Sequence, residues 1–470
     1  MVDDTYWIEK WLKQEIRSVG WQWLLGCFLL SGLACTPEDE VLTDESDALL
    51  AFNRDTVQFD TVFTSVGSTT QWLQVYNPQR NAVNITSITL GTEAAASPFR
   101  IIVNGEAGTQ FDDVLLRGGD SLLMLVEVTI DPQSTDLPFI VEDSIAFRTN
   151  GNVQYVNLEA WGQDAYFIKS GVVTEDITFS AERPYVVCDS LWVLPPATLT
   201  LAPGTQLYFN NDAYLLVGGT LQAEGTPEDR VVLQHVRRDG GYLNAPGQWQ
   251  GVFFAAESSN NQLNFTTIRN ANVGASISSP DNDTIPDITF ANTIIENMAA
   301  YGIYAIDTDV EAYNTVISNC AWGLVRGLGR ASYRFRHCTL VNEYTSFPQR
   351  DSLSLFFNAV VTRYAPDQAF SLDISNSIIW GDLDNELQVI SFTSDRFELA
   401  ATLIKTVDTA EVESNVYNIP PEFVDPRLYD YRLDSLSPAV DAGSPVGIEQ
   451  DLEGKPRDAA PDLGAYEYTQ

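Results

Sequence analysis

A five-residue pattern of hydrophobic and polar positions recurs through the middle of the chain. It consists of a small residue, an aliphatic residue two positions later and a final asparagine, and copies begin at Thr266, Thr293, Thr315 and Cys338. The closing asparagines are 27, 22 and 23 residues apart: Asn270, Asn297, Asn319 and Asn342. On an extended strand the small and aliphatic residues point to the same face. One copy is too short to bury that face alone, so the pattern predicts a solenoid of stacked coils.

Two kinds of solenoid have a period of this length. Leucine-rich repeats need Leu-x-Leu-x-x-Asn followed by a helical segment. Here the segments between copies are rich in β-branched residues, interrupted by glycine and without a helical period. We therefore predict a right-handed parallel β-helix over residues 170–420, with Ile268, Ile295 and Ile317 stacked inside. Its corner would carry a column of asparagines, whose amides can bond to the backbone or to the next copy.

Residues 50–166 have a different pattern, in which short β-runs such as 72–76 and 122–130 alternate with turns. The turns are marked by dipeptides such as Asn104-Gly105 and Asn150-Gly151. About seven strands in a segment of this length predict an immunoglobulin-like β-sandwich. The predicted fold class is thus all-β: a sandwich, a parallel β-helix and a C-terminal cap over residues 421–470.

The N-terminus carries a short apolar run, residues 21–33, after a stretch that contains Lys10, Lys13 and Arg17. Thirteen residues are too few to span a bilayer but suit the apolar region of a signal peptide. Residues 1–35 resemble a bacterial lipoprotein signal, in which Cys35 would be lipidated; Cys27 follows a better recognition box but too short a run. An ordinary cleaved signal peptide and a buried structural cysteine are the alternatives. Residues 36–49 are acidic and predict a tether.

Charge narrows the classes of partner. The chain has 26 basic and 64 acidic residues and a net charge of -38, so its surface should repel nucleic acid and anionic lipid headgroups. Cations and neutral glycans remain compatible with it, as does a merely solvated acidic surface. The five cysteines have no metal-type spacing. Cys338 is predicted to be a buried thiol, and its place in the coil argues against a disulfide with Cys320.

Three segments resemble known families. Residues 219–252 resemble the opening coils of the pectin-lyase-like superfamily. Residues 126–132 and 161–165 resemble the Ig-like domains that precede β-helices in envelope lipoproteins. Residues 430–468 closely resemble the C-terminal segment of the "choice-of-anchor Q" group of bacterial β-helix proteins. The resemblance implies a lipid-anchored protein of the cell outer membrane, whose last segment seals the open end of the rod.

The resemblance also implies where catalysis would occur. Lyases of the superfamily need calcium-binding carboxylates on one outer face and an arginine or lysine as base, and hydrolases need converging carboxylates. Asp307, Asp309 and Glu311 alternate along one expected strand, so they would project to the same side. Asp281 and Asp283 lie about one coil upstream, which completes a possible calcium set. The candidate catalytic residues are Asp307, Asp309, Arg326 and Arg330.

Less specific interpretations compete with these sites. Asp281 and Asp283 lie in a Ser/Pro-rich insertion that is typical of turns, and alternating acids are common on exposed strands. Asp441, Asp451, Arg457 and Asp462 could form a catalytic cluster, but we expect ion pairing that fixes the last segment. Four aromatic residues could stack on sugars or pack structurally: Tyr301, Tyr304, Trp322 and Trp380.

The sequence therefore favours a lipid-anchored envelope protein that binds or scaffolds without catalysis, with a polysaccharide or other glycan as ligand. Two alternatives remain open at this point. One is a polysaccharide lyase or glycoside hydrolase that acts on acidic polysaccharide, with or without calcium. The other is a surface adhesin that binds a protein.

Overall fold

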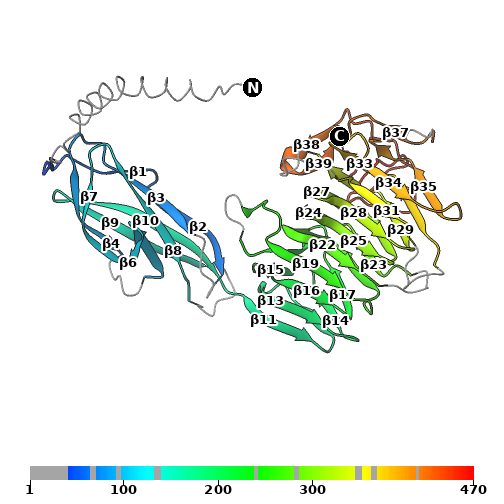
Figure 1. The fold of residues 1–470 in the computed structure, drawn as a ribbon, viewed down its shortest axis with the longest axis horizontal. Coiled ribbons are helices and arrows are strands. Elements are labelled where there is room, and N and C mark those ends of the chain that lie inside the picture. Colours follow the sequence, from blue (N-terminus) through cyan, green and yellow to red (C-terminus); the bar gives the residue numbers. More distant parts are fainter. Residues whose placement is uncertain are drawn as a thin grey trace, which may run out of the picture. The chain divides into compact units, whose positions relative to one another are not determined.

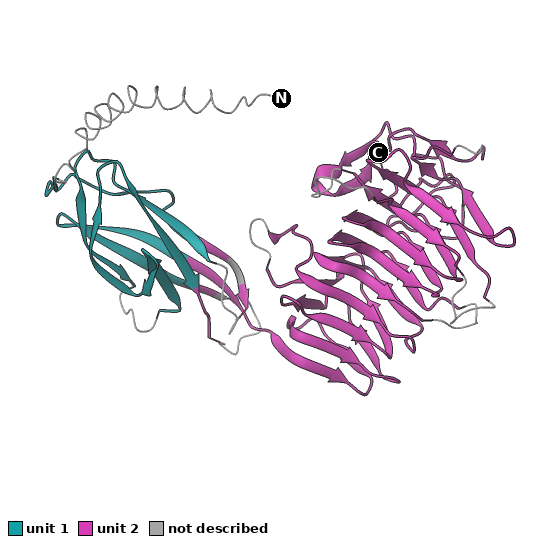
Figure 2. Ribbon diagram, viewed as in Figure 1, with its two compact units in different colours: residues 1–57, 70–127, 142–158 teal, residues 58–69, 128–141, 159–470 magenta. Residues whose placement is uncertain are grey.

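The computed structural model describes residues 41–63, 70–91, 97–131, 139–237, 242–279, 285–343, 352–360, 368–408 and 412–469. Regular structure in these residues is β-strand apart from short 3-10 turns such as Pro426–Leu428, which confirms the all-β prediction. The chain divides into two compact units, coloured in Figure 2. The signal segment with Cys35 lies outside the described residues.

The N-terminal strands form two five-stranded sheets (Figure 1). One sheet has the order β1 (Ala51–Phe52), β3 (Gln71–Tyr76), β8 (Ser121–Val128), β5 (Phe99–Val103), β6 (Glu106–Gly108). The other has the order β2 (Thr56–Phe63), β10 (Asn152–Gln163), β9 (Phe139–Thr149), β4 (Val83–Leu90), β7 (Gln110–Leu116). Pairs such as β3–β8 and β4–β9 are antiparallel, and alternate residues such as Leu73 and Val75 are buried. The immunoglobulin-like topology of these sheets stays a prediction.

The rest of the chain winds into coils that each add one strand to three parallel sheets, here named C, A and B in chain order. Sheet C contains β15 (Gln206–Phe209), β18 (Val231–His235), β21 (Thr266–Arg269), β24 (Ile294–Met298), β27 (Val316–Cys320), β30 (Thr339–Asn342), β33 (Ile378–Gly381), β36 (Leu403–Ile404) and β37 (Val416–Tyr417). Sheet A contains β16 (Tyr214–Val217), β19 (Trp249–Phe254), β22 (Ala271–Ile277), β25 (Tyr301–Ile306), β28 (Gly323–Leu328), β31 (Leu355–Asn358) and β34 (Leu387–Ile390).

Sheet B contains β12 (Ile177–Phe179), β14 (Thr198–Leu201), β17 (Thr220–Glu224), β20 (Asn261–Asn264), β23 (Ile288–Ala291), β26 (Val310–Tyr313), β29 (Ser332–Arg336), β32 (Ser371–Ser375) and β35 (Arg396–Ala400). The long strands β11 (Tyr166–Val173) and β13 (Tyr185–Val193) open the stack, and β13 pairs with both β15 and β16. Figure 1 shows the resulting pile of coils. The predicted parallel β-helix-like repeat fold is therefore confirmed.

The repeat that predicted the solenoid lies in sheet C in the expected register. Ile268 is the strand partner of Ile295, and Ile295 is the partner of Ile317. All three side chains are fully buried. The core thus runs through the coils as columns of like residues, each coil resting on its neighbours.

The asparagine column also forms, at the corner between sheets C and A. The Asn297 amide donates to Asn270 Oδ1 at 3.4 Å, and that of Asn319 donates to Asn297 Oδ1. Asn342 leaves the column, because its amide donates instead to the Cys320 carbonyl at 2.8 Å.

A second column, at the corner between sheets B and C, was not predicted. Here the amide of Asn292 donates to Asn264 Oδ1 and that of Asn314 donates to Asn292 Oδ1, each at 2.9 Å. Side-chain amides therefore link successive coils at both corners of sheet C.

The C-terminal segment, residues 421–469, contains β38 (Phe423–Asp425) and β39 (Asp430–Leu433) and is otherwise irregular. It packs on the outward-facing side chains of sheet C, including Ile294, Val316 and Leu403. A Cβ added at Gly454 would lie 3.0 Å from Pro227, several coils earlier. The predicted end seal is therefore not what these contacts show. The segment covers a flank of the stack, because the outward residues of sheet C are apolar and need a second layer.

Polar residues of this segment have the structural role that we expected. Arg457 bonds to Glu467 and to Asn314 Oδ1, both at 2.9 Å, and its side chain is 2% exposed. Burial lowers the pKa of the Arg457 guanidinium. Asp451 accepts backbone N–H groups from Glu453 and Lys455. The Arg457–Asn314 bond fixes the segment to the second asparagine column, whereas the Asp451 bonds hold a turn within the segment.

The cysteine predictions also hold in the described part of the chain. Cys320 and Cys338 are buried, and neither forms a disulfide with a described residue. Burial raises the pKa of the Cys338 thiol to about 12, so this thiol is a packing residue without nucleophilic character at neutral pH.

Candidate functional site

Three of the predicted sugar-stacking residues meet on the outer face of sheet A. The Tyr301 ring centroid is 5.4 Å from that of Tyr304 and 5.7 Å from that of Trp322, the latter pair edge to face. Trp322 is 58% exposed and the tyrosines are half-buried. We call these three residues the aromatic cluster.

Strand periodicity and one glycine explain why the cluster forms. In β25 the residues Ile303 and Ala305 point into the core, which leaves Tyr304 on the outside. The strand partner of Tyr301 is Gly323. A Cβ at Gly323 would lie 3.6 Å from the Tyr301 ring and 2.8 Å from the Leu353 carbonyl. The bare glycine therefore permits the close approach of the Leu353 carbonyl, and the Tyr301 ring packs beside it at ordinary contact distance.

A cation extends the cluster toward the following coils. Arg326 is the strand partner of Tyr304 on one side and of Phe356 on the other. Its Cζ lies 4.6 Å from the Phe356 ring centroid and 5.9 Å from that of Tyr301. Cation–π contacts of this kind hold a guanidinium over aromatic faces, so the cluster has a positive charge beside it in a strongly acidic protein.

The same outward column continues toward the first coils. Its strand partners in order are Trp192, Leu216, Phe253, Ser276 and Tyr304. The indole N–H of Trp192 donates to the Tyr214 hydroxyl at 3.3 Å, and the Tyr214 and Phe253 rings meet edge to face at 6.3 Å. These aromatic residues of the first coils form a separate group, because Ser276 lies between Phe253 and Tyr304 in the column.

Side-chain amides lie next to the aromatic cluster, at the corner between sheets C and A. The Asn272 amide donates to Gln250 at 2.8 Å, and the Gln250 amide donates to Asp212 at 3.1 Å. The backbone carbonyl of Asn272 accepts from the Ala300 backbone N–H, and the backbone carbonyl of Ala300 accepts from the Trp322 backbone N–H. A ligand on the cluster would thus meet aromatic rings, a guanidinium and hydrogen-bonding amides.

Trp380 does not belong to this surface. It lies in sheet C, is 6% exposed and packs in the cluster under the C-terminal segment. Lys405 Nζ lies 5.4 Å from its ring. Of the two interpretations of Trp380, structural packing is the one that the structure shows, because the C-terminal segment covers this face.

The three acids of the predicted calcium and catalytic site are not on one strand. β25 ends at Ile306 and β26 begins at Val310, so Asp307 and Asp309 lie in the corner between them. Both are buried, and Asp307 has a positive φ of 48°. Glu311 alone lies on a strand, and it pairs with Arg334 at 3.4 Å and with Arg336. The prediction of a shared outer face is therefore wrong.

The corner acids bond to the backbone of neighbouring coils. Asp307 accepts Arg330 N–H at 3.1 Å, and Asp309 accepts Ser332 N–H at 2.6 Å. Burial, together with these two carboxylates, raises the pKa of Tyr333. Carboxylates engaged in this way hold successive coils together, as the asparagine columns do.

The two candidate arginines are also separated. Arg326 is on sheet A in the aromatic cluster's column, whereas Arg330 follows β28 and pairs with Asp395 at 2.9 Å. Asp281 and Asp283 lie outside the described residues. In the described part of the chain no three acidic, histidine or cysteine side chains form a group that could hold a metal.

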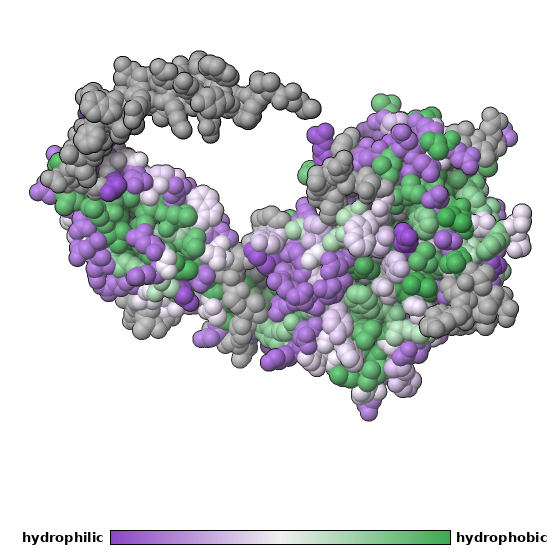
Figure 3. Space-filling view, viewed as in Figure 1, coloured by the Kyte–Doolittle hydropathy of each residue, from purple (hydrophilic) through white to green (hydrophobic). Residues whose placement is uncertain are grey.

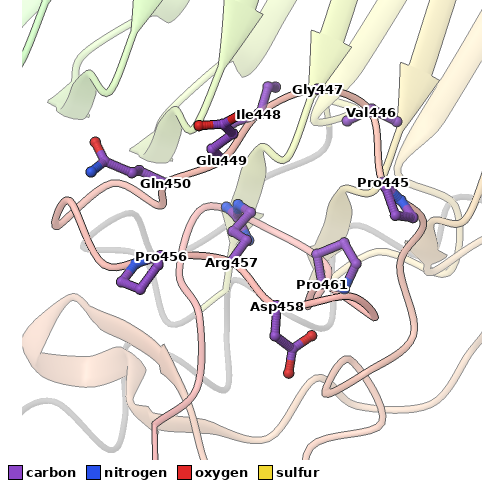
Figure 4. A pocket seen from close by; sticks show the side chains of 10 residues that line it. All are labelled: Pro445, Val446, Gly447, Ile448, Glu449, Gln450, Pro456, Arg457, Asp458 and Pro461. Atoms are coloured by element: carbon purple, nitrogen blue, oxygen red, sulfur yellow. The ribbon is translucent and has the colours of Figure 1, made fainter.

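One pocket of about 450 Å³ lies on the C-terminal segment (Figure 4). Its lining is mainly proline and aliphatic residues, with Glu449, Gln450 and Asp458 among them. Arg457 also lines it, but its guanidinium is engaged with Glu467 and Asn314 as described above. The Arg457 guanidinium in this pocket therefore has a structural role.

Comparisons with known proteins do not assign a family. No family model matches the chain. The Protein bark beetle of Drosophila melanogaster is 35% identical over 71 residues, which are 15% of this chain and 2% of that protein's length. The match to a PapD-like domain of human CEP192 covers 28% of this chain and 96% of the CEP192 domain, at 9% identity and with a TM-score of 0.18. The match to a family 123 glycoside hydrolase from Clostridium perfringens covers 24% of this chain and 26% of the hydrolase chain, at 8% identity and with a TM-score of 0.18. Such TM-scores are too low to show a shared fold.

Within residues 41–469, gaps excepted, no helix is long and apolar enough to cross a bilayer.

Proposed function

We propose that this protein binds carbohydrate at the cell envelope without catalysis, and that the aromatic cluster is its ligand surface. The observation that carries the proposal is the meeting of Tyr301, Tyr304 and Trp322 on one outer face, beside Arg326. Residues from two successive coils build this surface, and it is open to solvent at Trp322.

Sugar rings have an apolar face and a hydroxylated edge, and the cluster offers partners for both. Tyrosine and tryptophan rings combine an apolar face with a polar group at the edge. Arginine and amide side chains bond to hydroxyl or carboxylate oxygens. The surface is open rather than enclosed, with Trp322 58% exposed, which suits part of a polysaccharide chain better than a small, enclosed ligand.

A binding panel tests the proposal. The purified protein would be run by affinity electrophoresis against neutral and uronic-acid polysaccharides, with and without calcium. We expect retardation by at least one polysaccharide, and a loss of affinity of about tenfold or more in Trp322→Ala, since one aromatic stacking contact is worth on the order of 1–2 kcal/mol.

The matched control is Trp161→Ala, which removes another exposed tryptophan, 48% accessible, from the N-terminal strands. Retardation that is equal in both variants would contradict the assignment of the ligand surface. Calcium-dependent appearance of unsaturated sugar ends, lost in Asp309→Asn, would favour the lyase alternative.

We further propose that Cys35 carries a lipid anchor in an outer membrane. The predicted tether over residues 36–49 is wrong for its described part, because Thr43 N–H donates to the Ala82 carbonyl at 2.9 Å and Ala48 is 3% exposed against the N-terminal strands. If Cys35 is the anchor, Cys35→Ala should leave the membrane fraction when it is expressed in a gram-negative host. Retention of Cys35→Ala in that fraction would show that the anchor is wrong, and it would leave the carbohydrate proposal untouched.

A further inference from the structure

Among the described residues, two of the three sheets have no further strand at the C-terminal end of the coil stack. β34 is the last strand of sheet A and β35 is the last strand of sheet B among the described residues, whereas sheet C continues through β36 and β37. Figure 1 shows β34, β35 and β37 at the same end of the stack. The end is therefore a step, with sheet C rising beside the shorter sheets A and B.

The step encloses an apolar notch of about 400 Å³. Its floor contains the inward-facing residues Leu387 and Val389 of β34 and Phe397 and Leu399 of β35. Ile404, Thr406 and Tyr417 of the sheet C side complete the wall. Phe397 is 46% exposed, whereas its strand partner Leu372 is fully buried. The notch therefore exposes apolar side chains that one more coil would cover.

The backbone around the notch selects the kind of occupant. A terminal strand of a parallel sheet presents a row of N–H and C=O groups along its open edge. Two of the carbonyls at the notch, those of Leu387 and Leu399, accept the side-chain amides of Asn385 and Asn415 at 2.9 and 3.1 Å, so an incoming strand would displace these amides. An extended peptide can satisfy these groups by adding one more strand. Its alternate side chains would enter the notch above Phe397 and Leu399, and the others would face outward.

Charge around the notch narrows the occupant further. Asp382 and Asp384 are exposed in the turn before β34, and Asp408 and Glu413 are exposed on the sheet C side. Asp408 also lines the notch. An apolar floor with an acidic rim complements a strand in which apolar residues alternate with basic ones.

We propose that this notch docks an extended segment of a partner protein, with alternating apolar and basic side chains, as an added β-strand. The site is separate from the aromatic cluster and does not depend on the carbohydrate proposal. Binding there closes the stack, because the added strand supplies the apolar side chains that the last coil lacks.

The test uses the full chain and a fluorescein-labelled peptide, Lys-Val-Lys-Val-Lys-Val-Lys, in a fluorescence-anisotropy titration at physiological salt. We expect saturable binding with a dissociation constant below about 100 µM, in the range of strand-addition sites. The same peptide with N-methylated lysine backbone nitrogens keeps its charge and side chains but cannot donate the backbone hydrogen bonds that would face the edge of β34, because the outward-facing residues of each added strand bond to the strand before it. It should bind at least tenfold more weakly.

A variant of the protein provides the second arm. Phe397→Asp places a charge in the notch and should weaken peptide binding at least tenfold. Leu436→Asp, at a side chain that is 84% exposed in the C-terminal segment, is the matched control and should bind like the wild type. If Phe397→Asp does not fold, the N-methylated peptide still decides the question on the wild-type protein.

Three results would overturn the proposal: equal binding of the N-methylated peptide, equal binding of a Glu-Val-Glu-Val-Glu-Val-Glu peptide, or no binding at all. Sedimentation velocity supplies a fourth. If the protein dimerises and Phe397→Asp abolishes the dimer, a second copy occupies the notch instead of a foreign strand.

Discussion

At the scale of single residues, the corners of the coils depend on side chains that accept a left-handed backbone. Asn270, Asn297 and Asn319 have φ values of 65°, 62° and 51°, and asparagine tolerates this region better than most residues. Their amides then bond along the stack. The sequence predicts this column because three coils repeat it in register.

The corner that contains Asp307 was harder to predict. Period two assigns Asp307, Asp309 and Glu311 to one face only if all three are on one strand. The positive φ of Asp307 ends that strand, and the acids turn to backbone N–H groups of the next coil. A single aspartate carries no pattern from which this turn could be recognised.

His337 occupies the same kind of corner and gives a testable pH dependence. It is fully buried; its Nδ1 lies 3.1 Å from the Asp462 carbonyl and its Nε2 lies 3.0 Å from the Asn376 amide. Burial, and then the Arg457 guanidinium, lowers the pKa of His337 to about 3. Both ring nitrogens have a neighbour, which the sequence did not reveal.

A depressed histidine pKa means that the folded protein binds fewer protons than the unfolded chain. Its contribution to stability is complete above about pH 6.5 and is lost as the pH falls toward 3, at about 1.4 kcal/mol per pH unit. We expect His337→Asn, which suits the left-handed φ of 51°, to show a shallower loss in this window when urea midpoints are measured against pH. Identical slopes would contradict the assignment.

Asp462 acts in the opposite direction nearby. Burial raises the pKa of its carboxyl to about 6. The folded protein therefore holds this proton more tightly, so the contribution of Asp462 is present below about pH 4 and is lost as the pH rises through 6. In an Asp462→Asn variant the contribution of this carboxyl to stability is absent, so the pH dependence that is due to His337 can be measured alone.

At the scale of elements, the sequence predicted the strands better than the surface that covers them. In sheet C both alternate positions are apolar, as in Thr293-Ile294-Ile295 and Thr315-Val316-Ile317. Such runs are typical of strands buried on both faces, and this signal could have placed the C-terminal segment on the flank. The prediction instead followed the resemblance of the C-terminal segment, which implied a seal at the open end of the rod.

A core substitution tests this placement. Leu463 is fully buried between the C-terminal segment and sheet C, so Leu463→Ala should weaken the docking of the segment by about 2–4 kcal/mol. Hydrogen exchange should then accelerate in residues 421–469 while the amides around Ile317 stay protected. Leu428→Ala, at a side chain that is 76% exposed, is the control. Equal exchange in both variants would show that the flank contact is not stabilising.

At the scale of the whole molecule, a short repeat period was enough to predict a stack of coils, because each coil contacts only its neighbours. Where ligands bind could not be predicted in the same way. Tyr301, Tyr304 and Trp322 are near one another only because two coils are aligned by strand register, and the covering of Trp380 depends on a segment some 50 residues later. The sequence alone does not distinguish an aromatic residue that stays exposed from one that a later segment covers.

The most direct test of the central claim is a crystal structure of the protein soaked with an oligosaccharide from the polysaccharide that it binds best. The account predicts a sugar ring stacked on the exposed face of Trp322, with a hydroxyl or carboxylate oxygen within hydrogen-bond distance of Arg326. Density for the sugar at another face, with the aromatic cluster empty, would contradict it.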